Sequence, residues 1–485
     1  MTDMIIPAPA AGTPAASAPS ALPGATKLTG NLGVASIVFM VVAAAAPLTV
    51  VGGVIPMGFA FGNGLGFPVM FFVSAAILIL FSVGMSQMAS RIPTPGAFYT
   101  YVQHGIGEKS GAATALVAIV TYVAAPVSAL TLMGVQLNIT VVSLGGPDIA
   151  WWIYCLLTIA LVGVLGYRHI DLSSKVLGIL LVAEVAIVAV LVAVVFATGG
   201  AEGYSAEPFT TGAVFSGELG VGLTFALLGF VGFEATAVFR DEARNPGKTI
   251  PRATYIAVVS VGLFYAISAY SMVVAWGPDG VVEESLGDPA GMLVATTQNY
   301  LGAMGSIVAQ VLLLTSIFAC ILSFHNVTAR YFHALGQSGV LPSRLGLTHK
   351  RHVSPHMGSL TQTTLCAATI LVFAMLSLDP MLQVFAWMGG LTTSGFLILL
   401  VLTSLAVLTF FMRKRGKGNV WTTRVAPALG LAGLVLSGAL VVLNFPMLVG
   451  GSPALAYSLL AVFPVAAVIG VVLAIRRGPI QPTVT

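Results

Sequence analysis

The sequence predicts an all-α integral membrane protein with about twelve transmembrane helices. Of its 485 residues, 57% are hydrophobic and only 7% are charged, whereas about a quarter of an average soluble domain is charged. A soluble fold with so few charged side chains could not cover its core with polar groups. The medium around the protein must therefore be lipid, and the apolar residues are grouped into runs of spanning length.

Each of these runs approaches or exceeds the roughly 20 residues that cross a bilayer. They lie at 33–58, 64–90, 111–142, 149–167, 172–197, 213–239, 252–276, 300–335, 357–378, 381–412, 424–446 and 453–475. The stretch 94–107 is shorter and mixed, so we expect an interfacial helix or hairpin there. Residues 1–28 lack the basic start and apolar stretch of a signal peptide and are predicted to form a disordered cytoplasmic tail.

The basic residues predict the orientation, because Lys and Arg are enriched in cytoplasmic loops. With the N-terminus inside, all 20 Lys and Arg residues fall on cytoplasmic segments, while the outer loops carry acidic residues from Asp148 to Asp379. An even number of spans with both termini in the cytoplasm fits this pattern, in a multi-pass protein of the plasma membrane. The net charge of +4 follows from this topology and needs no nucleic-acid partner.

The sequence contains no arrangement that indicates an enzyme. Cys155, Cys320 and Cys366 lie inside apolar runs without disulfide or metal spacing. We find no nucleophile–base pair, no phosphate loop and no paired histidines with an intervening carboxylate. No catalytic residue, metal or cofactor is therefore predicted. A polytopic membrane enzyme stays a remote alternative, as does a sensor, which should add a soluble signalling domain.

The first and sixth spans are interrupted near their middles. In the first span, Pro47 removes a backbone donor and clashes with the preceding turn. In the sixth, Gly229 and Gly232 each cost a helix about 1 kcal/mol relative to Ala. Irregular backbone at this depth survives only where it is buried in protein or lines a cavity. These interruptions are therefore candidate functional positions, although ordinary proline and glycine kinks are the alternative.

The two interruptions occupy corresponding positions if helices 1–5 and 6–10 form two inverted repeats, and such pairs point to a transporter binding site. Exposed amides at a half-helix N-terminus suit a substrate carboxylate, and freed carbonyls suit an amine or a cation. A flanking phenylalanine, Phe230 in the first place, could close over the substrate or simply pack. The predicted substrate-binding residues are Ala46, Pro47, Leu48, Thr49, Gly229, Phe230, Gly232 and Phe233.

Several motifs in chain order resemble the amino acid–polyamine–organocation (APC) superfamily of transporters. They are ProThrProGlyAlaPheTyrThrTyr at 93–101, GlyPheValGlyPheGlu at 229–234, GluAlaArgAsnPro at 242–246, IleProArgAla at 250–253 and the run from Asn326 to GlnSerGlyValLeuPro at 337–342. The resemblance implies a ten-helix core of the leucine-transporter type over 29–412, a 5+5 inverted repeat with broken helices 1 and 6. Two appended helices would follow in 413–485.

The chain departs from this family's usual pattern in helix one. Members usually carry a Gly-rich break there, whereas this chain has AlaProLeuThr at 46–49. That stretch is more similar to members described as putrescine or amine permeases. The resemblance therefore leaves the substrate class open.

Two acidic residues inside the spans could couple transport to protons. Glu184 lies about twelve residues into the fifth span, near the membrane centre at 1.5 Å per residue, where a carboxylate must be paired or protonated. Proton-coupled APC members carry a lysine at what resembles this position. Glu184 could instead partner a polar group on helix one or eight, or bind sodium. Glu234 follows the sixth-helix break and could brace it, sense protons or meet an amine.

The predicted function is a secondary transporter that imports an amino acid by alternating access, with a proton as the coupling ion. A polyamine or amine permease is an alternative, since Glu184 and Glu234 could supply negative charge for a second ammonium. An amino acid exchanger is another. The lipid bilayer is the other expected partner, and the oligomeric state is not predicted.

Overall fold

The computed structural model describes residues 32–89, 91–92, 98–168, 174–234, 236, 243–349, 352, 354–413 and 419–477. Within these ranges the structure is helical apart from its loops, with a single parallel β-bridge between Leu32 and Ala243. The predicted tail 1–28 lies outside the described residues, as do residues 93–97 of the proline motif.

Ten helical segments of the described chain are long and apolar enough to cross a membrane, and two shorter apolar helices bring the number to the predicted twelve. This confirms the fold class. The spans are α1 to α3 (Val34–Ala44, Pro47–Thr49 and Ile55–Phe61), α4 (Phe67–Ala89), α6 (Glu108–Ser143), α7 (Trp151–Tyr167), α8 (Ser174–Thr198), α10 (Leu219–Leu228) with the turns after it, α12 (Pro246–Trp276), α14 (Met292–Gln337), α15 (His356–Met375), α16 (Ala386–Arg413), α17 (Ala426–Leu448), and α18 with α19 (Pro453–Leu460 and Val462–Arg477).

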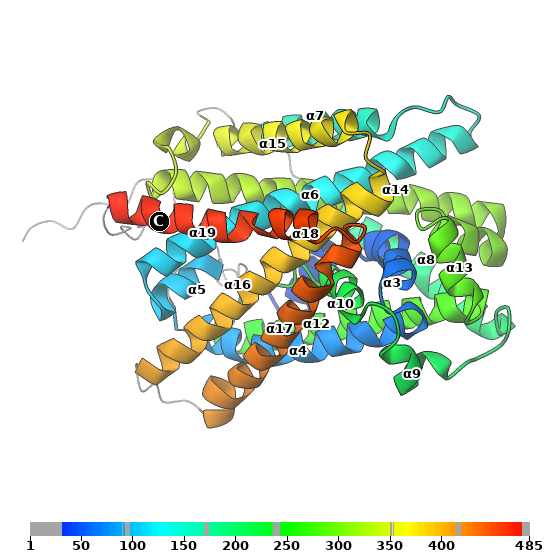
Figure 1. The fold of residues 1–485 in the computed structure, drawn as a ribbon, viewed down its shortest axis with the longest axis horizontal. Coiled ribbons are helices and arrows are strands. Elements are labelled where there is room, and N and C mark those ends of the chain that lie inside the picture. The colour runs from blue at the N-terminus through cyan, green and yellow to red at the C-terminus, as the bar shows by residue number, and fades with distance from the viewer. Residues whose placement is uncertain are drawn as a thin grey trace, which may run out of the picture.

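Most of the helices run roughly along the long axis of the molecule, with α16 and α17 crossing it obliquely, so the helix ends gather at two opposite ends (Figure 1). The end at the left of Figure 1 holds α5 (Phe98–Gly105) and the end of α19. We call it the basic end, because the described Lys and Arg residues lie at or near the helix ends on this side. They are Arg91, Lys109, Arg168, Lys175, Arg244, Lys248, Arg252, Arg330, Arg344, Arg413, Arg424, Arg476 and Arg477.

The opposite end carries the short helices α9 (Thr211–Val214) and α13 (Gly280–Gly287) (Figure 1). Its loops hold acidic residues in place of basic ones, among them Asp148, Glu202 and Asp379. The two ends of the bundle therefore differ in charge as the sequence predicted. Apolar side chains such as Leu157 and Leu443 are 65% and 69% exposed between the ends, which suits a surface that faces lipid.

One segment forms as a helix where it was expected, and another differs in its bounds. The helix within 94–107 forms as α5 at the basic end; its Phe98, Tyr101 and Val102 are only 0–3% exposed, so this face packs against the spans, while His104 is exposed. Gly105 allows this, because an added Cβ would lie 2.3 Å from the Ala406 carbonyl oxygen of α16. Helix α14 begins at Met292, before the predicted 300, and continues through a break at Gly302 (φ 70°).

Close backbone packing of α17 on α4 should be sensitive to one methyl group. An added Cβ on Gly430 would lie 2.8 Å from the Phe81 backbone nitrogen, so we expect Gly430→Ala to destabilise the protein by about 1–3 kcal/mol. Gly438→Ala on the same helix meets no atom within 4 Å and serves as the control. Thermal unfolding in detergent measures both; equal melting temperatures for the two variants would contradict this packing.

Candidate substrate site

The first span breaks at Ala46, whose φ of 46° lies in the left-handed region that non-glycine residues rarely adopt. Helix α1 has ended two residues earlier, and Pro47, which has no N–H, starts the half-helix α2. The Tyr265 hydroxyl of α12 donates to the Ala45 carbonyl at 3.2 Å. A π-helical turn at Val50–Val54 then leads into α3. Another helix therefore supplies a partner for the carbonyl next to the break.

The sixth span breaks after α10 ends at Leu228. The chain continues in turns, and Gly232 adopts a φ of 111°, which glycine tolerates because it has no Cβ. Glu234 binds this segment: its carboxylate accepts from the Gly232 N–H at 2.9 Å and from the Tyr122 hydroxyl of α6 at 2.8 Å. The two breaks lie against each other, since an added Cβ on Gly229 would lie 3.2 Å from Val50 Cγ1.

A cavity of about 60 Å³ lies between the two breaks and helices α6, α14 and α16, enough for a few water-sized groups. Most of its wall is aliphatic or aromatic, and none of the residues that line it is charged. The polar groups on the wall are hydroxyls and one thiol. The lining residues are Ala45, Thr49, Val50, Val54, Ala125, Ser128, Ala129, Leu228, Val231, Cys320, Phe324, Phe385 and Thr392.

The hydroxyls on the cavity wall already have acceptors. Thr49 donates to Ser316 Oγ at 3.1 Å, and Ser128 donates to the Phe385 carbonyl at 3.1 Å. Thr392 donates to the carbonyl one turn earlier in its own helix, at 2.8 Å. The wall therefore presents an apolar surface to whatever occupies the cavity.

Of the predicted substrate-binding residues, Thr49 lines this cavity, while Ala46, Pro47, Leu48, Gly229 and Gly232 form the backbone of the two breaks. The two phenylalanines point elsewhere. Phe230 packs against Phe71 and Tyr265, with ring centroids 6.5 and 6.3 Å away, and Phe233 packs against Phe81 and Phe396, at 6.1 and 6.0 Å. Val231, between them, is the side chain that reaches the cavity.

Glu184 of α8 lies beside the first break and is only 5% exposed. The Ser316 hydroxyl of α14 donates to its Oε2 at 2.7 Å, and the carboxylate lies close to the Leu48 backbone amide. The structure thus brings Glu184 together with helices one and eight, as one of the sequence hypotheses held. The Leu48 amide belongs to the first turn of α2, where the helix dipole favours a negative charge.

An aromatic stack lies between the cavity and the basic end. Phe324 lines the cavity, and its ring centroid is 6.4 Å from that of Tyr122. Tyr122 in turn contacts Tyr331 at 5.2 Å, and Tyr331 contacts Tyr99 of α5 at 5.9 Å. Tyr331 lies closer than Phe324 to the basic end of α14. We call these four rings the inner aromatic stack; they separate the cavity from that end.

Sequence reasoning missed several residues of the site. Ser316, Thr392 and Ser128 are hydroxyl residues within apolar spans, which are too common to stand out. Tyr122 had no motif that linked it to Glu234, 112 positions away. A signal existed for Ser316 only, because the buried Glu184 required a polar partner on a neighbouring helix.

Two broken helices that face each other across a cavity, within twelve spans, are an arrangement typical of secondary-transporter folds. The chain belongs to the amino acid permease family, whose sequence profile matches residues 25–476. This confirms the resemblance to the APC superfamily.

The chain is similar to permeases with different substrates. It is 23% identical to the low-affinity putrescine importer PlaP of Escherichia coli over 292 residues, a match that covers 58% of this chain and 62% of the importer, less than two thirds of its length. It is 26% identical to the branched-chain amino acid permease BcaP of Lactococcus lactis over 393 residues (76% and 81% of the two chains). A probable GABA permease of Pseudomonas aeruginosa is 24% identical over 390 residues (75% and 77%). These three relatives are named as an importer and two permeases.

The hydrogen bond between Tyr122 and Glu234 should stabilise the sixth-helix break. We expect Tyr122→Phe to destabilise the protein by about 1.5–3 kcal/mol, because the carboxylate loses a buried donor. Tyr154→Phe is a matched control, since the buried Tyr154 hydroxyl has no hydrogen-bond partner among the described residues. The test is thermal unfolding of both variants, and a Tyr122→Phe variant as stable as Tyr154→Phe would refute the role of this bond.

Proposed function

We propose that this chain is a secondary transporter that imports a neutral amino acid with a small or branched aliphatic side chain, together with a proton, by alternating access. It acts in the plasma membrane with the basic end toward the cytoplasm. Residues 29–412 form the transport core, and 413–485 carry the appended helices. The observation that supports the substrate class most directly is the uncharged, mainly apolar cavity between the two breaks.

The wall of this cavity suits an aliphatic side chain better than a second charged group. Val50, Val54, Leu228 and Val231 contribute branched aliphatic surface, and Phe324 closes one side. A diamine would need a carboxylate for its distal ammonium, because an unpaired buried charge is strongly destabilised. Glu184 and Glu234 do not line the cavity, and both already accept hydrogen bonds. The branched-chain permease among the relatives supports the same class.

The contact between Glu184 and Leu48 suggests how a proton and a substrate are coupled. A substrate carboxylate favours the N-terminus of a half-helix, and in this conformation the Glu184 carboxylate lies close to the Leu48 amide there. A proton on Glu184 removes its negative charge, so that a substrate carboxylate can approach this amide without repulsion. Proton binding and substrate binding then favour each other, which is the thermodynamic requirement for symport.

The inner aromatic stack is our candidate for the gate at the basic end. Its rings come from α5, α6 and α14, and Tyr122 is hydrogen-bonded to the sixth-helix break through Glu234. Movement of the broken helix would therefore be transmitted to the inner aromatic stack through the Glu234 side chain. Release toward the basic end requires these rings to separate.

Replacement of Glu184 should abolish proton coupling while substrate can still bind. In proteoliposomes, we expect an imposed inward proton gradient to drive amino acid accumulation by the wild-type protein. Glu184→Gln keeps the shape of the side chain but cannot take up a proton, so it should exchange substrate across the membrane without accumulation. Glu207→Gln, at an exposed position in the short 3-10 helix Glu207–Phe209, is the control and should behave as wild type. Unchanged gradient-driven accumulation in Glu184→Gln would remove the coupling role.

The size of the cavity should set side-chain preference. Val231→Ala removes two methyl groups from the wall, so the ratio of kcat/KM for leucine to that for alanine should rise, on the order of tenfold for a methylene-sized change. Val221→Ala, on the same span, 1% exposed and away from the wall, should leave the ratio unchanged. Equal ratios in the two variants would mean that the side chain of the substrate does not contact Val231.

Polyamine import is the second candidate, favoured by AlaProLeuThr at 46–49 and by the similarity to a putrescine importer. The same proteoliposomes distinguish it. If excess putrescine leaves valine uptake unchanged, the neutral substrate class stands. If labelled putrescine is itself accumulated and valine is not, the substrate class is wrong while the transporter assignment holds.

A further inference from the structure

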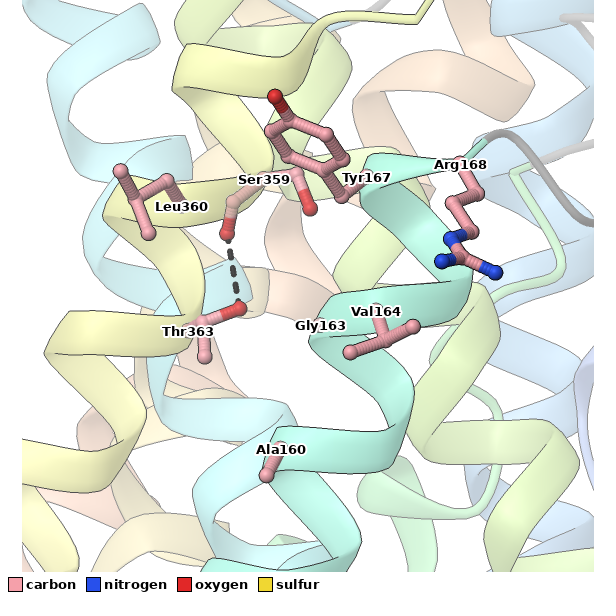
Figure 2. Close-up of a pocket in the computed structure, with 8 residues that line it drawn as sticks. All are labelled: Ala160, Gly163, Val164, Tyr167, Arg168, Ser359, Leu360 and Thr363. Carbon is pink, nitrogen blue, oxygen red and sulfur yellow. Dashed lines mark hydrogen bonds between the residues drawn. The ribbon is translucent and has the colours of Figure 1, made fainter. Parts of the chain in front are cut away.

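A second, larger concavity lies between α7 and α15, away from the central cavity. It is a groove of about 390 Å³ (Figure 2), within the range of about 300–1,000 Å³ that is typical of small-molecule sites. Ala160, Gly163 and Val164 of α7 form one wall, and Leu360 and Thr363 of α15 form the other. The small residues of α7 bring the helices together, because an added Cβ on Gly163 would lie 2.6 Å from Thr363 Oγ1.

The groove lies on the surface that faces lipid. Val164 and Leu360 are 51% and 53% exposed, and Leu157 and Leu161 on α7 continue this apolar surface. Figure 2 shows Leu360 on α15 and Val164 on the neighbouring α7. A ligand could therefore enter from the bilayer.

The serine and threonine hydroxyls of the groove already have hydrogen-bond partners. Thr363 Oγ1 donates to the Ser359 carbonyl at 3.0 Å, and Ser359 Oγ lies 2.9 Å from His325 Nε2. No acidic side chain is among the described residues that line the groove. The interior thus suits a hydrocarbon chain, which needs no polar partner.

One end of the groove is cationic and lies at the basic end of the bundle. Arg168 follows the last turn of α7 and is exposed there, beside Tyr167. Figure 2 shows its guanidinium extending back along α7 toward the level of Val164. Histidine rings pack around Tyr167: those of His349 and His356 lie 5.3 and 5.9 Å from its ring. An apolar groove with a guanidinium at the membrane–water boundary matches an acyl chain that ends in an anionic headgroup.

We propose that this groove binds an anionic phospholipid from the leaflet at the basic end, with its phosphate on Arg168 and an acyl chain between α7 and α15. The planar guanidinium can form two parallel hydrogen bonds to a phosphate. Anionic lipids are also attracted to basic groups near the membrane surface. The proposal is independent of the transported substrate.

Native mass spectrometry of the purified full-length protein tests the headgroup preference, with phosphatidylglycerol and phosphatidylcholine of identical acyl chains as probes. Wild type should retain phosphatidylglycerol in preference. Arg168→Gln should reduce that preference about fivefold, the equivalent of about 1 kcal/mol. Arg344→Gln, an exposed arginine of the same end that does not line the groove, should keep the wild-type preference.

A second variant tests the acyl-chain part of the groove. Ala160 is exposed on the wall, so Ala160→Phe should fill the groove without entering the protein core. It should lower retention of both lipids while leaving thermal stability unchanged. The proposal is overturned if wild type retains the two lipids equally, if Arg168→Gln keeps the preference, or if a stable Ala160→Phe variant retains lipid as wild type does.

Discussion

The structure depends on how the backbone is satisfied where two helices are interrupted inside the membrane. In hydrocarbon an unpaired amide or carbonyl has no water to bind, so a break is stable only if other protein groups form the missing hydrogen bonds. At the sixth-helix break, the Glu234 carboxylate accepts from the Gly232 amide of its own segment. At the first break, the Tyr265 hydroxyl donates to the Ala45 carbonyl, and the Glu184 carboxylate of α8 lies close to the Leu48 amide. Each break therefore has a carboxylate beside it, and each carboxylate accepts a hydrogen bond from a hydroxyl of another helix.

This arrangement explains why two acids occur in spans that are otherwise almost free of charge. Their partners differ, because Glu184 contacts a serine and Glu234 a tyrosine of the inner aromatic stack. Glu184 is connected to the cavity wall through Ser316 and Thr49. Glu234 is connected to the side of the bundle that leads to the basic end. In the transport function that we propose, binding and release would thus depend on different carboxylates.

Much of the fold could be predicted from the sequence, because a membrane requires long apolar runs and separates the charges to its two sides. Both patterns can be read from one sequence. The positions of Pro47 and Gly232 likewise predict the breaks. The side-chain lining of the cavity could not be predicted. Across an irregular turn neither helical nor strand periodicity applies. Spacing therefore could not show that Val231 lines the cavity while Phe230 and Phe233 pack against other buried rings. Ser316 and Tyr122 come from distant spans whose rotation about their axes is set only by tertiary packing.

The β-bridge at the basic end has a mechanical consequence. Arg244 donates its backbone N–H to the Leu32 carbonyl at 3.0 Å, just ahead of α1 and just after the sixth span. This bridge ties the residues that lead into α1 to those that lead into α12. A displacement of α1 at the basic end would therefore be transmitted directly to the start of α12.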